Sequence, residues 1–256
     1  MTSDLPYRIQ TSAGHRKYLC SGIYMPSVTT VLSATESEKS KAGLRNWQKN
    51  NPGALEAAST RGSAIHLGCE NYLRGLDPGV PEDYLDFWNG MSPYLDWFDT
   101  IHWSERPLRP DWNHLRSEDR EVAFVWSTEH KYAGCPDLIG EIGGVRVIAD
   151  FKTSNAPYCA SFPDRGDRIG FGGYRKYTKC AQQMAAYRYA LNERTGFLCE
   201  AALIIVSTPE TTQGIFIDGD QLALHESRFL KRCQQFHEID NETTDCSSQK
   251  LQEQAK

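Results

Sequence analysis

The chain has 256 residues, of which 39% are hydrophobic and 11% aromatic, and its formal net charge is −5. This composition suits one globular domain, and the negative charge excludes a protein that coats nucleic acid through bulk electrostatic attraction. No apolar stretch approaches the ~20 residues of a membrane-spanning helix, so we expect no membrane partner. The N-terminal residues show no secretory or mitochondrial targeting pattern, and we therefore expect a cytoplasmic protein.

The first half of the chain reads mainly as helices. Residues 7–24 are expected to form an irregular or hairpin-like entry, after which Ser27 is a good N-cap. Helices are predicted, in chain order, at residues 28–32, 36–49, 54–74 and 82–103. Pro93 should kink or break the last of them. The polar, proline-bearing segment 106–120 is expected to be a loop.

In the second half, strand patterns with a period of two become frequent. Strands are predicted at residues 121–126, 138–142, 145–151, 201–207 and 214–218. Gly143-Gly144 marks a hairpin turn between the second and third of these strands. Two helices are predicted, at residues 179–193 and 221–239, and Asp220 is a plausible N-cap for the second.

The order of these elements predicts an α/β fold. We expect a single domain over residues 1–240, in which residues 26–105 form a mainly helical part and residues 121–240 the α/β core. Residues 241–256 are polar and are expected to form a flexible tail.

Three short motifs, taken in order, favour metal-dependent hydrolysis of a phosphodiester. Gly134 to Asp137 is a tight turn that ends in a carboxylate, and Asp150-Phe-Lys152 closes an apolar strand. The third motif, Gln183 to Tyr187, lies in a predicted helix. Because side chains i and i+2 of a strand share a face, Asp150 and Lys152 should face one site, while the phenylalanine between them points into the opposite layer.

These residue types suit the chemistry. Two carboxylates, Asp137 and Asp150, and the imidazole of His66 can hold a divalent metal, which polarises the phosphoryl oxygen and lowers the pKa of an attacking water. Lys152 can orient that water or stabilise developing charge. Each residue also has an ordinary alternative: a turn aspartate, a salt bridge at a strand end, or a satisfied core histidine.

The motifs together resemble the PD-(D/E)xK nuclease superfamily in its RecB-like branch, which combines a helix histidine, a G-x-x-D turn, a D/E-x-K strand and a Q-x-x-x-Y helix. A closer likeness is to the mitochondrial genome maintenance exonuclease group and its phage relatives, over about residues 26–240. Pro26 to Leu32, Asp150 to Ser154 and Ala202 to Val206 carry this likeness. The resemblance implies a restriction-endonuclease-like core, in which helices flank a central mixed sheet, with an N-terminal helical addition.

The resemblance also implies a catalytic set and a cofactor. The catalytic residues would be Asp137, Asp150, Lys152 and His66, and the backbone carbonyl of Phe151 would join both aspartates and the histidine as a metal ligand. Mg²⁺ or Mn²⁺, as one or two ions, is the expected cofactor. Some RecB-like nucleases hold an iron–sulfur cluster, but the eight scattered cysteines lack its closely spaced ligand group, and we expect no cluster here.

Other residues are candidates for supporting roles. Glu70 and Glu121 could assist the site or be ordinary acids. Contacts with DNA are expected from Arg61, Thr153, Ser154, Arg175, Lys176, Lys179, Gln183 and Tyr187. The alternatives are a contact with the catalytic strand for Gln183, a capped strand end for the hydroxyl residues and core packing for the tyrosine. Segment 155–179 is expected to be a long, partly mobile basic loop that guides a strand to the metal.

The leading hypothesis is a monomeric, metal-dependent exonuclease that acts on single-stranded DNA ends or flaps. Its expected setting is replication or repair in a bacterial or phage-infected host cell. One alternative is a structure-specific or duplex DNA endonuclease, and another is a nuclease-fold module that binds DNA without cutting it. An enzyme that handles sugars or nucleotides would be expected to show a glycine-rich phosphate loop, which this chain lacks.

Overall fold

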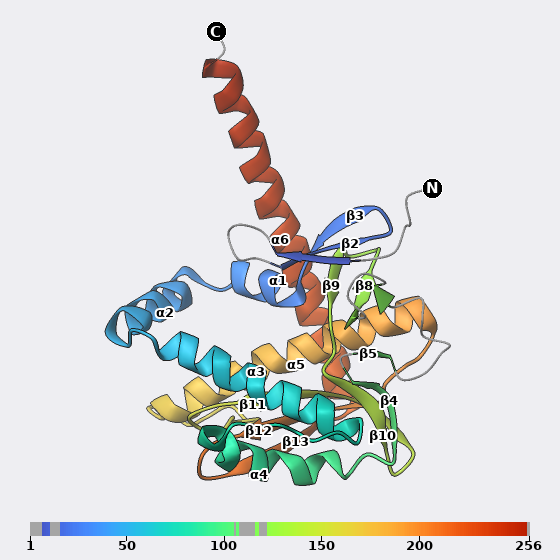
Figure 1. Ribbon diagram of the computed structural model, residues 1–256. Coiled ribbons are helices and arrows are strands. Elements are labelled where there is room, and N and C mark those ends of the chain that lie inside the picture. The colour runs from blue at the N-terminus through green and yellow to red at the C-terminus, as the bar shows by residue number, and fades with distance from the viewer. Residues whose placement is uncertain (1–6, 11–15, 105, 108–115, 118–121, 255–256) are drawn as a thin grey trace.

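A mixed six-stranded sheet forms the centre of the protein (Figure 1). The computed structural model describes the backbone of residues 7–10, 16–104, 106–107, 116–117 and 122–254, and the side chains of residues 17–104, 124–167 and 170–240. The strands, in spatial order, are β13 (Thr212–Ile217), β12 (Ala201–Ser207), β11 (Val145–Thr153), β10 (Leu138–Ile142), β4 (Thr100–Ser104) and β5 (Arg106–Pro107). Only β11 and β12 are parallel neighbours, so the predicted mixed sheet is confirmed.

The N-terminal addition contains a small sheet as well as helices. Strands β1 (Tyr7–Gln10), β2 (Arg16–Cys20) and β3 (Ile23–Pro26) pair antiparallel, which confirms the hairpin-like entry. Helices α1 (Val28–Ala34), α2 (Glu38–Asn50) and α3 (Ala54–Leu73) follow. Ser27 is the N-cap of α1, because its Oγ accepts a hydrogen bond from the backbone N–H of Thr30 at 3.0 Å.

The prediction of a helix at residues 82–103 is wrong for the last part of this range. A 3-10 turn (Glu82–Tyr84) and α4 (Leu85–Leu95) form there, but the chain then enters β4 of the central sheet. Pro93 lies inside α4, and the helix ends two residues later. Thr100, Ile101 and Trp103 are β-branched or aromatic residues that suit a pleated strand, and the pairing of β4 with β10 overrides the helical pattern. The mainly helical region therefore supplies one strand of the central sheet.

Several short strands precede the core hairpin. They are β6 (Arg116–Ser117), β7 (Val122–Ala123), β8 (Val125–Ser127) and β9 (Tyr132–Gly134). The predicted strand at residues 121–126 appears as β7 and β8, whereas β9 was not predicted. Most of the loop expected at residues 106–120 lies outside the described residues, as does Glu121. The hairpin at Gly143-Gly144 is confirmed, and both glycines have positive φ values, of 57° and 79°.

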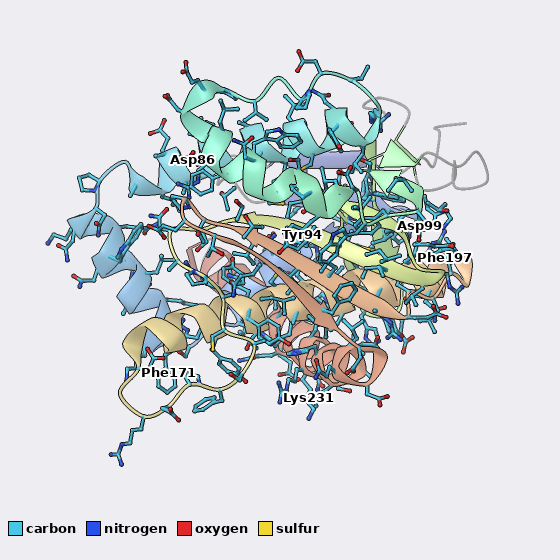
Figure 2. All side chains as sticks on the ribbon, turned by 90° about the horizontal axis from the view of Figure 1, so that it is seen from below. Asp86, Tyr94, Asp99, Phe171, Phe197 and Lys231 are labelled. Atoms are coloured by element: carbon cyan, nitrogen blue, oxygen red, sulfur yellow. The ribbon has the colours of Figure 1, made fainter. Side chains whose placement is uncertain are left out.

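Helices cover both faces of the sheet (Figures 1 and 2). Alternate residues of β11 pack on opposite sides: Val147, Ala149 and Phe151 belong to the apolar cluster with α3 and α4, whereas Ile148 belongs to the larger cluster with α5 and α6. In Figure 2, Tyr94 on α4 and Lys231 on α6 lie on opposite sides of the sheet. The expected orientation of Phe151, away from Asp150 and Lys152, is confirmed.

Helix α5 (Arg168–Thr195) begins eleven residues before the predicted start at Lys179. Its N-cap is Asp167, whose Oδ1 accepts a hydrogen bond from the backbone N–H of Gly170 at 2.8 Å. The glycines of its first turns indicate an irregular segment in the sequence, but one of them is needed for packing: a Cβ on Gly173 would lie 2.9 Å from the carbonyl oxygen of Pro157. The prediction of a loop over residues 155–179 is therefore wrong beyond residue 167, where the chain is helical.

The last helix, α6 (Gly219–Gln254), also differs from its prediction. Asp218, rather than Asp220, accepts the capping hydrogen bond, from the N–H of Gln221 at 2.8 Å. The helix continues past the predicted end at Ile239, so the backbone of the expected frayed tail is helical as far as Gln254. Among the described residues, no helix is both long and apolar enough to cross a membrane.

Candidate active site

The site forms where β10 and β11 separate. β11 pairs with β10 only as far as Ala149, and its remaining residues continue beside β12 alone. The backbone of Phe151 therefore has a free edge, and it uses this edge to hold two other elements. Its N–H donates to Oδ2 of Asp137 at 2.9 Å, and its carbonyl oxygen lies 2.9 Å from Nε2 of His66. The predicted turn carboxylate and the predicted helix histidine thus meet at the end of the predicted catalytic strand.

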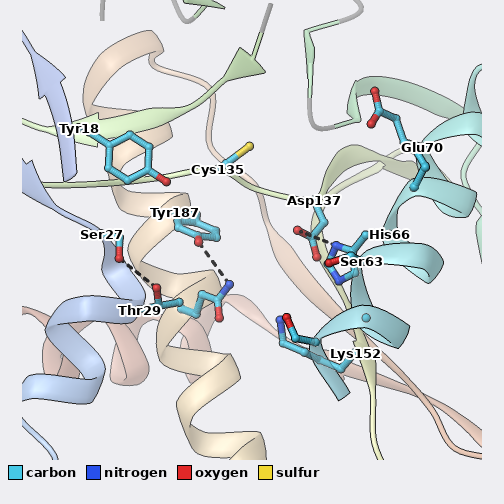
Figure 3. A pocket seen from close by; sticks show the side chains of 14 residues that line it. Tyr18, Ser27, Thr29, Ser63, His66, Glu70, Cys135, Asp137, Lys152 and Tyr187 are labelled. Atoms are coloured by element: carbon cyan, nitrogen blue, oxygen red, sulfur yellow. Dashed lines mark hydrogen bonds and ion pairs between the residues drawn. The ribbon is translucent and has the colours of Figure 1, made fainter. Parts of the chain in front are cut away.

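His66 and Asp137 face each other at the edge of a cleft (Figure 3). Nδ1 of His66 lies 3.6 Å from Oδ1 of Asp137. The aspartate is only 8% exposed, while the histidine side chain keeps 27% of its surface exposed. Both ring nitrogens face oxygen acceptors, one from a carboxylate and one from a backbone carbonyl.

Asp150 and Lys152 share a face of β11, as predicted, and form an ion pair. Asp150 is completely buried, and its carboxylate is also bonded by two groups of α5. The Sγ of Cys180 donates to Oδ2 at 3.1 Å, and Nε2 of Gln183 donates to Oδ1 at 3.1 Å. All the described bonds to this carboxylate thus come from one strand and one helix.

Charge and burial set the protonation of the groups around Asp150. Burial lowers the pKa of Lys152, but the Asp150 carboxylate, followed by Cys180 and Asp137, outweighs burial and raises that pKa well above its usual range. Burial, and then the Asp150 carboxylate, raise the pKa of the Cys180 thiol well above its usual range. At neutral pH the lysine is therefore a cation, and the thiol keeps the proton that it donates.

The turn and the Q-x-x-x-Y helix pack directly on each other. Tyr187 is 5% exposed, and its hydroxyl accepts a hydrogen bond from Nε2 of Gln183 at 3.2 Å. Gly134 has no room for a side chain, because a Cβ there would overlap Cε1 of Tyr187. The glycine of the G-x-x-D motif therefore allows the tyrosine of the helix motif to lie under the turn.

A cleft of about 460 Å³ opens over these groups (Figure 3). It is lined by Tyr18, Ser27, Thr29, Ser59, Gly62, Ser63, His66, Leu67, Glu70, Cys135, Asp137, Lys152, Gln183 and Tyr187. Sequence reasoning missed the wall that β2 and α1 contribute, for which no local signal exists. It also missed Cys180, although its spacing of three residues from Gln183 on one helix would have placed both on one face.

The remaining candidates lie around this cleft. Glu70 lines it and pairs with Arg74 at 3.2 Å. Arg61 places its guanidinium 4.5 Å from the ring centroid of Phe87. Lys176 donates to Oγ of Ser154 at 3.0 Å, close to the end of β11.

Two other basic candidates are partly neutralised. Arg175 and Lys179 pair with Glu36, at 3.3 and 3.6 Å respectively. No ion pair links Arg61 or Lys176 to an acid among the described side chains. Burial, and then repulsion from Arg61, lower the pKa of Lys176, so these two cations lie near each other. Thr153, the last residue of β11, lies beside Gly62 of α3.

The donors present suit a hard divalent cation. Adjacent ligands in an octahedral Mg²⁺ shell are about 3 Å apart. The 2.9 Å between His66 Nε2 and the Phe151 oxygen matches this spacing, and Asp137 adds a carboxylate at the same edge. Asp150 is instead turned toward Lys152, and in the described part of the chain no three His, Cys, Asp or Glu side chains are grouped at metal-binding spacing. The carbonyl oxygen of Phe151 lies beside the His66 ring and would be available to such a cation.

Comparison with known proteins places this arrangement in a family. The sequence pattern of the PD-(D/E)XK nuclease superfamily matches residues 39–250, which is most of the chain. The chain belongs to the PD-(D/E)XK nuclease superfamily. Membership makes it a nuclease-type hydrolase with DNA as its implied substrate, and nucleases of this superfamily typically use divalent metal ions.

More detailed comparisons add little to this assignment. No curated protein matches the sequence. This chain is similar to a solved structure titled "Crystal structure of SSO0001", with 16% sequence identity and a TM-score of 0.24. The similarity covers 41% of this chain and 41% of that one, and at such a score it supports no structural argument.

Proposed function

We propose that the protein is a metal-dependent exonuclease that hydrolyses phosphodiester bonds at single-stranded DNA ends or flaps, and that it belongs to the RecB-like branch near the mitochondrial genome maintenance exonuclease group. One observation carries the proposal. The four motifs of that branch, which are far apart in the sequence, meet through hydrogen bonds at the open edge of β11. A bacterial or phage-infected cell is the proposed setting, with the protein acting as a cytoplasmic monomer.

In this proposal, Asp137, Asp150, His66 and the Phe151 carbonyl hold Mg²⁺ or Mn²⁺, as one or two ions. The bound metal polarises the phosphoryl oxygen and lowers the pKa of the attacking water. Lys152 supplies positive charge where negative charge develops on the phosphate. Its raised pKa means that it acts as a cation and not as a base at neutral pH. Glu70, which lines the cleft, and Glu121, which lies outside the described residues, are proposed to support the site.

DNA phosphates are proposed to bind at the end of β11. Arg61 on α3 and Lys176 on α5 are cations without acidic partners among the described residues, and Ser154 bonds to Lys176. Repulsion between nearby cations is relieved by an anion, and a phosphate is the anion that a nuclease meets. Thr153 and Ser154 add hydroxyl groups that can donate to phosphate oxygens.

A second groove supports a single strand as the substrate. Helix α2 has no buried residue, and a groove of about 450 Å³ lies between it and α5. Its basic lining residues are Lys39, Lys41, Arg175, Lys176 and Lys179. We propose that a single strand lies in this groove on its way to the cleft, and we favour an exonuclease over an endonuclease because of the likeness to the mitochondrial genome maintenance exonuclease group.

We predict that His66→Ala weakens metal use more than DNA binding. The imidazole is the one nitrogen donor among oxygen ligands, so its loss should be partly rescued by raised Mn²⁺, which accepts mixed ligand sets. The measurement is the Mg²⁺ and Mn²⁺ dependence of cleavage, with DNA affinity determined in parallel. His102→Ala, which removes the ring that pairs with Glu141 outside the cleft, is the control. Unchanged metal dependence in His66→Ala would return this histidine to a packing role.

We also predict that changing Arg175, Lys176 and Lys179 to alanine weakens single-strand binding while sparing metal binding. Fewer counterions would be released on binding, so the salt slope of log K should fall by about 0.7 for each lost phosphate contact. Fluorescence anisotropy at several salt concentrations measures both quantities. Arg228→Ala with Lys231→Ala on α6 is the control. Unchanged affinity and salt slope in the triple variant would move the DNA path away from α5.

The proposed activity is tested with three labelled substrates. A Mg²⁺-dependent time course is run on 5′-labelled linear, 3′-labelled linear and circular single strands, with duplex DNA beside them. We expect stepwise shortening of the linear strands from one end and no cutting of the circle. Cutting of the circle or of internal duplex positions would support the endonuclease alternative, and binding without any cleavage would support the non-cleaving module.

A further inference from the structure

Two residues on one turn of α5 donate hydrogen bonds to the two oxygens of the fully buried Asp150 carboxylate. Cys180 donates to Oδ2 and Gln183 to Oδ1, each at 3.1 Å. Residues three apart lie on the same side of a helix, so one rigid element aims both donors at one carboxylate. Cys180 itself is only 3% exposed and is not among the residues that line the cleft. It is absent from every motif that identifies the superfamily.

These two hydrogen bonds constrain the orientation of the Asp150 carboxylate, which its ion pair with Lys152 cannot do. Lys152 carries its ammonium on a flexible four-carbon stem, so it can follow Oδ2 through many orientations. Two donors on one helix turn, with one for each oxygen, instead fix the plane of the carboxylate. Without Cys180, Oδ2 would keep only its lysine partner among the described groups.

The chemistry of a thiol suits this task. The S–H group is a weak donor, and cysteine otherwise packs as a small apolar side chain. Cys180 can therefore fill the buried space behind Asp150 and direct one oxygen, while leaving lone pairs on that oxygen for other partners. Groups that orient a metal ligand in this way commonly affect metal affinity, although they do not touch the metal.

We propose that Cys180, together with Gln183, is a positioning residue that sets the orientation of the Asp150 carboxylate for metal binding. This inference rests on the proposed function, because it takes Asp150 as a metal ligand. It gives Gln183 a role at the catalytic carboxylate, in addition to the DNA contact proposed for it, and it gives Cys180 a role that its sequence context does not suggest.

The test compares Cys180→Ala and Cys180→Ser with matched controls elsewhere in the core. Cys199→Ala and Cys233→Ala change cysteines that are equally buried, being 0% and 2% exposed, and that have no hydrogen bond to a carboxylate among the described residues. Mn²⁺ binding is measured directly by electron paramagnetic resonance without DNA, and the half-saturating Mg²⁺ concentration is measured in cleavage. Thermal unfolding records any general loss of stability.

We expect Cys180→Ala to bind Mn²⁺ about tenfold more weakly and to need correspondingly more Mg²⁺. Cys180→Ser keeps a donor and should stay close to wild type, and both control variants should match wild type. Should the alanine variant fail to fold, Cys180→Val makes the same comparison with the space filled.

The outcomes separate this inference from the function on which it rests. Equal Mn²⁺ affinity in Cys180→Ala and Cys233→Ala, with normal cleavage by the wild type, would overturn the positioning role alone. A wild-type protein that neither binds Mn²⁺ nor cleaves DNA would overturn the proposed function, and the positioning role with it.

Discussion

Asp150→Asn is expected to lower the cleavage rate by about 10²–10³-fold or more, with DNA binding largely intact. The substitution keeps the size of the side chain but removes its negative charge, which both the metal and Lys152 require. The new amide can still accept a hydrogen bond from Gln183 through its oxygen. The loss should therefore fall on the chemical step, and only modestly on folding. Single-turnover cleavage measures the rate, and anisotropy measures DNA affinity.

The matched control for this substitution is Asp86→Asn, which makes the same change in the first turn of α4. That variant should cleave like the wild type. Near wild-type cleavage by Asp150→Asn would remove this residue from the mechanism, while loss of folding, detected by circular dichroism, would make the carboxylate a structural group first.

Lys152→Ala should lower cleavage by about 10²-fold while metal binding is retained, since the ammonium supplies charge rather than a ligand. The sign of its pH dependence follows from its pKa. A lysine whose pKa is raised by folding contributes its full share of stability below its unfolded pKa of about 10.4. This stability is lost only as the pH rises through the higher pKa of the folded state, so the lysine stays charged at neutral pH. The ratio of wild-type to Lys152→Ala rates should therefore stay constant from about pH 6 to 9.

The pH profile of this ratio separates a cation from a base. A ratio that changes between about pH 6 and 9 would mean that Lys152 gains or loses its proton there, which contradicts its role as a fixed charge. Lys231→Ala removes an exposed lysine of α6 that lines neither the cleft nor the groove between α2 and α5, and it is the control for general charge effects. Its rate should match that of the wild type across the range.

Local patterns in the sequence were enough to predict strand β11. An apolar run that ends in Asp150-Phe-Lys152, behind a Gly-Gly turn, specifies a hairpin and the face of each side chain. The structure confirms this hairpin and brings Asp137 and His66 to its end. The contact of Asp137 and His66 with the end of β11 was predicted only from the family resemblance, because no local sequence pattern links α3 to β11.

The errors came from interactions between distant segments. Gly173 looks like a loop residue in the sequence, yet it is needed where α5 crosses the carbonyl of Pro157. β4 follows a helix without a clear break and becomes a strand because β10 offers a partner. In the same way, Tyr18 and Ser27 reach the cleft only because the N-terminal sheet and α1 fold against the core. Propensity alone carries no information about such contacts.

We propose that Asp150, beside the Asp137–His66 edge of β11, supports metal-dependent cleavage of DNA. The most direct measurement is a cleavage time course on labelled single strands with metal-free protein, to which Mg²⁺ or Mn²⁺ is then added, for the wild type and Asp150→Asn. We predict no cleavage in the presence of a chelator, recovery of wild-type cleavage on addition of either metal, and no recovery for Asp150→Asn at any metal concentration. Cleavage by the chelated wild type, or full recovery of the variant, would contradict this account.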